Sequence, residues 1–197
     1  MGSATAIAQR PMRADAQRNY DRIVEVASDA FAERGVLTSL DDIACRAGVG
    51  PGTLYRHFPT RDGLIAAALG GSLDRLAALA ERLRASDDPS AALDEWMLAL
   101  AGHLRTYDNL PESIAEAFRQ EDSPLRNTCQ PLTQTTSVLV DRAKAVGALH
   151  GDIDYRDVFL LVSSVAWGSQ RRGDSDDDLE RMLALATGGI RESHTAG

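Results

Sequence analysis

The stretch "GVGPGTLYRHFPTRDGL", residues 48–64, decides the fold of the N-terminal part of the chain. Its first glycines predict a tight turn, and Pro51 is favoured as the first residue of a helix. Phe58 precedes a proline, and such a residue avoids the α region, so the helix ends there. The sequence therefore predicts a very short helix, from about Pro51 to His57, that carries three large side chains with polar ends in a row.

A helical wheel places these side chains around the short helix at about 100° per residue. Leu54, Pro51 and Phe58 fall within about 60° of one another and are expected to form the buried side. A helix that enters a DNA major groove needs an arginine or hydroxyl group toward the bases and hydrogen-bond donors toward the phosphates. The opposite side and its flanks supply these groups, with Gly52, Thr53, Tyr55, Arg56 and His57.

Two further helices are predicted before the glycine turn. Apolar residues at spacings of three and four predict a first helix from about Asp15 to Arg34. The segment "SLDDIACRAG" (39–48) predicts a second, short helix that begins with Ser39 as its cap. Two short helices joined by a glycine turn are typical of a helix-turn-helix.

The segment "IACRAGVGPGTLYRHFPTRDGL" (43–64) resembles the DNA-binding signature of the TetR family of transcriptional regulators. The resemblance implies a DNA-binding domain over residues 15–62, a larger helical ligand-binding and dimerisation domain over 63–197, and a dimer that leaves its operator when a small molecule binds. It implies base contacts by Thr53, Arg56 and the backbone near Gly52, and phosphate contacts by Tyr55, His57 and Arg61. Ser39 is also expected to contact DNA. Asp41 departs from the basic or small polar residue that family members often have there.

Residues 1–14 are small, polar and basic, which predicts a flexible arm. Arg10 and Arg13 of this arm are either solvated or placed in a minor groove. Charge is uneven along the chain. Residues 1–62 hold eight arginines and eight acids, so the net charge of −8 belongs to the remainder.

The remainder also shows helical periodicity, so the sequence predicts an all-α protein of about nine helices. The fourth helix runs from a Thr60 cap through Leu83, and its Gly70–Gly71 pair, which weakens a helix by roughly 1 kcal/mol per glycine, marks a soft point. The other expected helices span about 89–106, 111–120, 123–146, 155–169 and 176–190.

Two sets of residues are expected to act in the C-terminal domain. Pockets are mostly apolar with a few polar groups, and the candidates for lining one are Trp96, His103, Tyr107, Phe118 and Trp167. The segment 157–167 is apolar nearly all round, which indicates a central helix or one shared with a partner. A two-fold bundle between subunits is expected to use Phe159, Val162, Val165, Leu179, Met182, Leu183 and Ala186.

Several other classes of protein are disfavoured. No strand precedes "GVGPG" and no GK[ST] follows it, so it is not a nucleotide-binding loop. A di-iron site is the alternative, with Glu112, Glu116 and His103 as its candidate ligands. It is disfavoured, because no histidine has the glutamate three residues earlier that the di-iron motif requires. The sequence thus predicts no metal, no cofactor and no enzymatic activity.

Two cysteines, Cys45 and Cys129, form no CxxC pair. Both are expected to be small buried hydrophobes, with a redox role as the alternative. The longest apolar stretch, 158–162, is far shorter than the roughly 20 residues of a membrane span, so a cytoplasmic protein without membrane contact is expected. The remaining functional alternative is a helical small-molecule-binding module that does not bind DNA.

Overall fold

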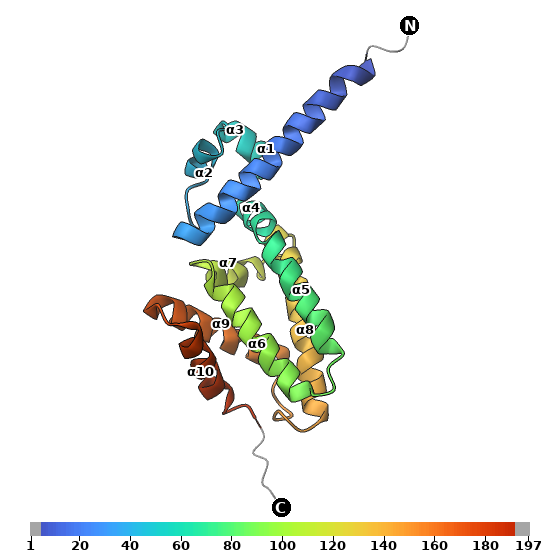
Figure 1. Ribbon diagram of the computed structural model, residues 1–197, viewed down its shortest axis with the longest axis vertical. Coiled ribbons are helices and arrows are strands. Elements are labelled where there is room, and N and C mark those ends of the chain that lie inside the picture. Colours follow the sequence, from blue (N-terminus) through green and yellow to red (C-terminus); the bar gives the residue numbers. More distant parts are fainter. Residues whose placement is uncertain (1–4, 192–197) are drawn as a thin grey trace, which may run out of the picture.

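The computed structural model describes residues 5–191, with side chains from Asp15 onward, and this part of the chain contains helices and no strand (Figure 1). The all-α prediction is therefore confirmed, with ten helices in the described range instead of about nine. They are α1 (Thr5–Arg34), α2 (Leu40–Arg46), α3 (Pro51–His57), α4 (Arg61–Ala68), α5 (Gly70–Arg84), α6 (Pro89–Arg105), α7 (Leu110–Ala117), α8 (Pro124–Ala145), α9 (Tyr155–Arg172) and α10 (Asp176–Thr187).

Helices α1 to α3 form a small N-terminal unit, called the head below. Ser39 accepts a hydrogen bond from the backbone N–H of Asp42 and begins α2, whereas Pro51 begins α3. Fully buried side chains of α1, α2 and α3, including Phe31, Ile43 and Leu54, meet in its core. Local caps and one shared apolar core thus define the helix-turn-helix.

The first helix begins at Thr5, so the prediction of a flexible arm over residues 1–14 is wrong for residues 5–14. This segment is rich in alanine, glutamine, methionine and arginine, which are strong helix formers, and they outweigh Pro11. The N-terminal part of α1 projects beyond the head (Figure 1). Residues 1–4, and the side chains of Arg10 and Arg13, lie outside what the structure describes.

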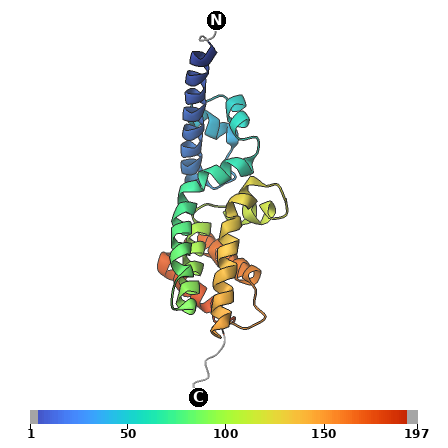
Figure 2. The same cartoon turned by 90° about the vertical axis from the view of Figure 1, so that its right-hand side faces the viewer.

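Helices α5 to α10 form the body, which lies beyond the head along the long axis of the molecule (Figure 2). Helix α6 is central, because it packs against α5, α8, α9 and α10. Its apolar residues are buried on most of its circumference, among them Leu93, Trp96, Met97 and Leu100. The body is thus a helical bundle built around α6, and α4 connects it to the head.

The expected fourth helix is broken into α4 and α5, whose axes differ by 55°. The break falls at Leu69, directly before the Gly70–Gly71 pair, and no protein atom lies within 4 Å of where a Cβ would stand at either glycine. The low helix propensity of glycine, rather than crowding, accounts for the bend.

No single helix among residues 5–191 has the length and hydropathy to cross a membrane; only α4 and α5 counted together across their bend reach that threshold.

Candidate functional site

The outer face of α3 presents polar groups to solvent. Leu54 and Phe58 are buried, whereas Gly52, Tyr55 and Arg56 are exposed. Pro51, which the wheel placed on the buried side, is also exposed, so the prediction is wrong for this residue. A Cβ at Gly52 would meet no atom within 4 Å, so nothing inside the chain requires a glycine there.

The flanks of α3 differ from each other in burial. Tyr55 is 46% exposed, but His57 is half-buried because its ring stands edge-on to Tyr20 of α1, with 6.1 Å between centroids. Tyr20 also lies 5.0 Å from the ring of Phe58. These contacts fix the orientation of His57 at the end of α3. Thr53 is half-buried as well.

Two residues expected at DNA have partners within the chain. Arg61 Nη1 donates hydrogen bonds to the carbonyls of Val36, at 2.9 Å, and Thr38, at 2.6 Å. Arg61 thus holds the α1–α2 loop through Nη1, and its expected phosphate contact stays a prediction. Ser39 is exposed, but its hydroxyl caps α2.

The charges of the head pair unevenly. Arg46 pairs with Glu33, and Arg34 lies 3.9 Å from Asp42. The hydrogen bond from Arg46 lowers the pKa of Glu33 below its ordinary value. Among the side chains that the structure describes, Arg22 and Arg56 have no carboxylate partner.

Arg22 was missed by the sequence reasoning. It is an exposed residue of α1, and its guanidinium lies beside the α2–α3 turn, 3.6 Å from where a Cβ would stand at Gly48. It therefore adds a positive charge to the same side of the head as the turn before α3. The helical spacing of Arg18 and Arg22, four residues apart, was the available signal.

The body contains a cleft of about 660 Å³ between α5 and α8, with α6 behind it. Trp96 lies in its wall, and the Trp96 indole N–H donates to Thr136 Oγ1 at 2.9 Å. Gly70, at the α4–α5 break, lines the same cleft, as do the charged residues Asp74, Glu81 and Arg84.

The other residues expected to line a ligand site lie apart. Phe118 contributes to a smaller apolar cavity of about 390 Å³ with Phe159. His103 and Tyr107 are buried between helices. Trp167 is 42% exposed on α9 under the guanidinium of Arg171, so the structure does not bring the five residues together.

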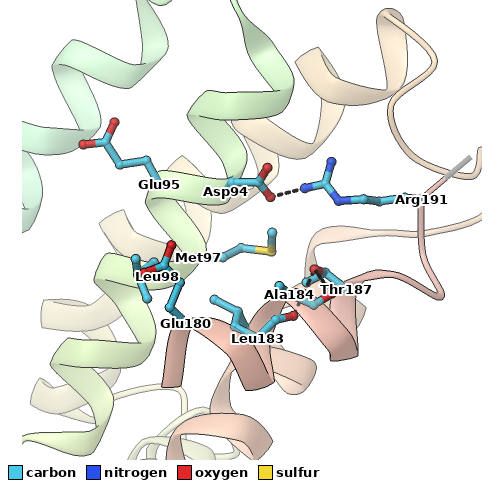
Figure 3. A pocket seen from close by; sticks show the side chains of 9 residues that line it. All are labelled: Asp94, Glu95, Met97, Leu98, Glu180, Leu183, Ala184, Thr187 and Arg191. Carbon is cyan, nitrogen blue, oxygen red and sulfur yellow. Dashed lines mark hydrogen bonds and ion pairs between the residues drawn. The ribbon is translucent and has the colours of Figure 1, made fainter. Parts of the chain in front are cut away.

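A further cavity of about 440 Å³ lies between α6 and α10 (Figure 3). Arg191 pairs with Asp94 at its edge and donates to Ser90 Oγ at 2.9 Å. Burial raises the pKa of Asp94 despite the opposing effect of Arg191. The pair ties the last described residue to α6.

The residues expected at a dimer interface are largely used inside the chain. Val162, Leu179 and Leu183 are buried in the body core, so their placement at an interface is wrong. Phe159, Val165, Met182 and Ala186 are half-buried. The large apolar residues that α9 and α10 leave exposed are Leu160, Trp167 and Leu185.

The two cysteines differ. Cys129 is buried as predicted, and burial raises the pKa of its thiol to about 12. Cys45 is exposed on α2, so the prediction of a buried hydrophobe is wrong there. Within residues 5–191, no cluster of three His, Cys, Asp or Glu side chains is arranged to hold a metal ion.

Two family profiles match the chain. Residues 23–68 match the bacterial regulatory proteins of the tetR family, and residues 88–192 match the C-terminal domain of SbtR-like transcriptional regulators. The second match alone spans more than half of the chain, and the first covers most of the helix-turn-helix.

Individual proteins agree with these profiles. The HTH-type transcriptional repressor Rv3405c of Mycobacterium tuberculosis is 36% identical over 95 residues, 48% of each chain, so the chain spans about half the length of this relative. The TetR transcriptional regulator SCO0520 from Streptomyces coelicolor is 31% identical, with a TM-score of 0.57 over 88% of this chain and 99% of that one. The fatty acid degradation regulator FadR from Bacillus halodurans, at 19% identity, shares the fold, with a TM-score of 0.63 over 89% and 97% of the two chains. A helix-turn-helix head with a polar α3, a helical body and these matches place the chain in the TetR family of transcriptional regulators.

Proposed function

We propose that the chain acts as a homodimeric repressor that binds a palindromic operator and leaves it when a small molecule binds the body. The observation that carries the DNA-binding part is the outer face of α3, where Arg56 and Tyr55 are exposed and Arg56 has no carboxylate partner among the described side chains. An unpaired guanidinium on a short exposed helix suits direct contact with guanine. The name of the mycobacterial relative supports repression.

Each residue of the interface is assigned a role from its surroundings. Arg56 and Thr53 face the bases, and the open space over Gly52 admits the DNA close to the backbone. Tyr55, His57 and Arg22 serve the phosphates on either side. Arg61 holds the α1–α2 loop through its two hydrogen bonds and thereby orients the head.

Fluorescence anisotropy against the upstream intergenic DNA of the gene tests this proposal, with a scrambled duplex for comparison. The wild type is expected to prefer its own region by orders of magnitude. Arg56→Ala is expected to cost roughly 1 to 3 kcal/mol and to lose that preference. Arg82→Ala is the matched control, because Arg82 is an exposed arginine of the body that pairs with Glu95.

The variant Gly52→Ala distinguishes an effect on DNA affinity from an effect on the stability of the fold. The added methyl group meets no atom of the chain, so stability is expected to be unchanged or slightly increased. DNA affinity is nevertheless expected to fall, because the methyl group occupies space that the DNA backbone or bases need. Equal affinity of wild type, Arg56→Ala and Gly52→Ala for both duplexes would instead favour a small-molecule-binding module without DNA binding.

Dimerisation is assigned to the outer faces of α9 and α10. Leu160 and Leu185 are each 68% exposed and Trp167 is 42% exposed, so these side chains of α9 and α10 offer apolar surface that a second copy of the chain would bury. A two-fold arrangement would present two copies of α3 about 34 to 36 Å apart, or a multiple of that distance, to successive major grooves.

The cleft between α5 and α8, which Trp96 lines, is assigned to the small molecule that releases the operator. It has the volume of a small-molecule site, and its wall includes Gly70 at the 55° break between α4 and α5. A ligand that fills the cleft would press on the helix that continues into α4 and the head. Binding would then change the bend and move the two heads out of register with the operator.

A further inference from the structure

Another pocket in the body, of about 480 Å³, differs in chemistry from the cleft lined by Trp96. It lies between the C-terminal end of α6 and the turn that joins α9 to α10. Thr106, Ser169, Gln170 and Asp174 are among its lining residues. None of the residues that line it also lines the cleft.

Three oxygens at this pocket are buried without a hydrogen-bond partner among the described residues: Ser169 Oγ, Gln170 Oε1 and Asp174 Oδ2. Ser169 is 3% exposed, and the side chain of Asp174 is 8% exposed. A buried polar atom without a partner costs roughly 1 to 3 kcal/mol, and more when it is charged. Three such atoms at one pocket indicate that something else satisfies them.

Hydrogen bonds and ion pairs to neighbouring residues determine which oxygens of Gln170 and Asp174 have no partner. Gln170 Nε2 donates to the carbonyl of Arg105 at 3.0 Å, which orients the amide and leaves Oε1 unpaired. Asp174 Oδ1 lies 3.2 Å from Arg172 Nε, which leaves Oδ2. Rotation of these two side chains cannot satisfy the unpaired oxygens without breaking another bond.

The nearest arginine on the other wall is also engaged. Arg105 Nη1 donates to the carbonyls of Asp174, at 3.0 Å, and Ser175, at 3.3 Å, while Nη2 pairs with Asp176. The guanidinium thus ties α6 to the start of α10. It is committed to these acceptors and does not reach the unpaired oxygens.

We propose that this pocket binds a small organic cation through N–H groups, either an alkylammonium or a guanidinium. All three unpaired atoms accept hydrogen bonds, and only the Ser169 hydroxyl also donates, so the ligand must be a donor. The Asp174 carboxylate selects a positive charge. The volume suits a small organic molecule. The two carboxylates of the lining, Asp174 and Asp176, each pair with an arginine, and no group of three possible metal ligands is found among the described residues.

The site joins the end of α6 to the consecutive helices α9 and α10, which lie more than 45 residues later in the sequence. A cation held by Ser169 and Gln170 at the end of α9, by Asp174 in the turn and by the wall of α6 would fasten α10 to the body. This inference is independent of the proposed DNA binding, since it rests on no residue of the head or of the cleft.

Isothermal titration calorimetry of the full chain tests the proposal, in about 0.15 M salt so that weak attraction to the acidic surface is screened. The probes are 1,4-diaminobutane, agmatine as a guanidinium, and 1,4-butanediol as the neutral match to the diamine. At least one cation is expected to bind once per chain, and the diol about a hundredfold more weakly than the diamine, because it lacks the charge.

Ser169→Ala is the decisive variant, because its effects on the free and bound protein have opposite signs. Removing an unpaired hydroxyl is expected to leave the thermal stability of the free protein unchanged or raised, while cation binding weakens about tenfold. Asp174→Asn is expected to weaken it further. Ser164→Ala is the matched control, since the exposed Ser164 hydroxyl already donates to the carbonyl of Leu160 at 2.8 Å, and binding should be unchanged.

Three results overturn the proposal. The first is no saturable binding of either cation. The second is equal affinity for the diol and the diamine. The third is a loss of free-protein stability in Ser169→Ala greater than in Ser164→Ala, which would mean that the hydroxyl already has a partner.

Discussion

The backbone N–H of Val36 donates a hydrogen bond to the carbonyl of Asp108 at 2.9 Å, and this contact joins the head to the body. Val36 follows α1, whereas Asp108 lies between α6 and α7. A second polar contact runs from Ser123 Oγ at the start of α8 to Asp62 of α4, at 2.8 Å. The first contact thus holds the head against the α6–α7 connection, and the second holds α4 against the start of α8.

Gly35→Ala is expected to destabilise this junction. Gly35 has φ +80°, and a Cβ there would lie 2.8 Å from both the carbonyl oxygen and the Cβ of Asp108. Left-handed strain and overpacking together are expected to lower the free energy of unfolding by about 2 to 4 kcal/mol. Urea denaturation measures this loss.

Gly173→Ala is the matched control, because Gly173 also has positive φ, +68°, but its Cβ would meet no atom within 4 Å. Only the strain applies there, at about 1 to 2 kcal/mol. Equal losses in the two variants would show that Asp108 gives way and that the junction is soft.

The double variant Gly70→Ala, Gly71→Ala is expected to stiffen the break between α4 and α5. Both added methyl groups stand in open space, and alanine favours helix over glycine by about 1 kcal/mol per residue. Hydrogen exchange of the Ser72 and Leu73 amides, which bond to the Leu69 carbonyl at 3.0 Å, should slow. Exchange rates equal to those of the wild type would argue against a hinge at this position.

Local signals made most of the helix boundaries predictable. Ser39, Thr60 and Ser123 accept hydrogen bonds from backbone N–H groups at helix starts, and Pro51 begins α3, as such residues do in many proteins. The Gly70–Gly71 pair predicted the weak point, although the sequence did not show that the helix would break there. These features depend on residues within a few positions of one another.

Contacts between distant segments could not be predicted in the same way. Helix α9 is apolar on several sides, so periodicity alone did not tell that Val162 faces the core and Leu160 faces solvent. The partners of Arg61 lie 23 and 25 residues earlier. The pocket at Ser169 forms where the end of α6 meets the α9–α10 turn. No sequence motif predicts this contact between distant segments.

The two cysteines are expected to react at very different rates with a thiol reagent such as iodoacetamide. Cys45 is exposed, whereas Cys129 is buried with a pKa of about 12, so it holds almost no thiolate near neutral pH. Mass spectrometry of the native protein should find modification at Cys45 alone. Cys45→Ser is the control and should remain unmodified until denaturant is added; rapid labelling of Cys129 in it would contradict its burial.

The combined variant Leu160→Glu, Leu185→Glu is expected to shift the proposed dimer to monomer. Both side chains are largely exposed in the single chain, so the change should leave its fold intact and act on the interface by burying two like charges per subunit. Light scattering with size-exclusion chromatography measures the mass. Leu37→Glu is the control, because Leu37 is 60% exposed in the head. A dimer that persists in the double variant would place the interface elsewhere.

His103 gives the stability of the body a specific dependence on pH. Burial, assisted by the charge of Arg75, lowers its pKa from 6.5 to about 4 in the folded chain. As the pH falls below 6.5, His103 becomes protonated in the unfolded chain but stays neutral in the folded chain until about pH 4. The free energy of unfolding therefore decreases as the pH falls through this range. The loss from this residue amounts to about 3 kcal/mol by pH 4.

His103→Leu is expected to remove this part of the dependence. The leucine replaces a buried ring whose Nε2 has no partner among the described residues, so stability near pH 7 should be similar or higher. Urea denaturation at a series of pH values from 4 to 7.5 should then show that the variant gains on the wild type as the pH falls, mostly between pH 6.5 and 4. A constant difference between the two curves would mean that His103 has the same pKa in the folded and unfolded chains, which would contradict the lowering of its pKa by burial.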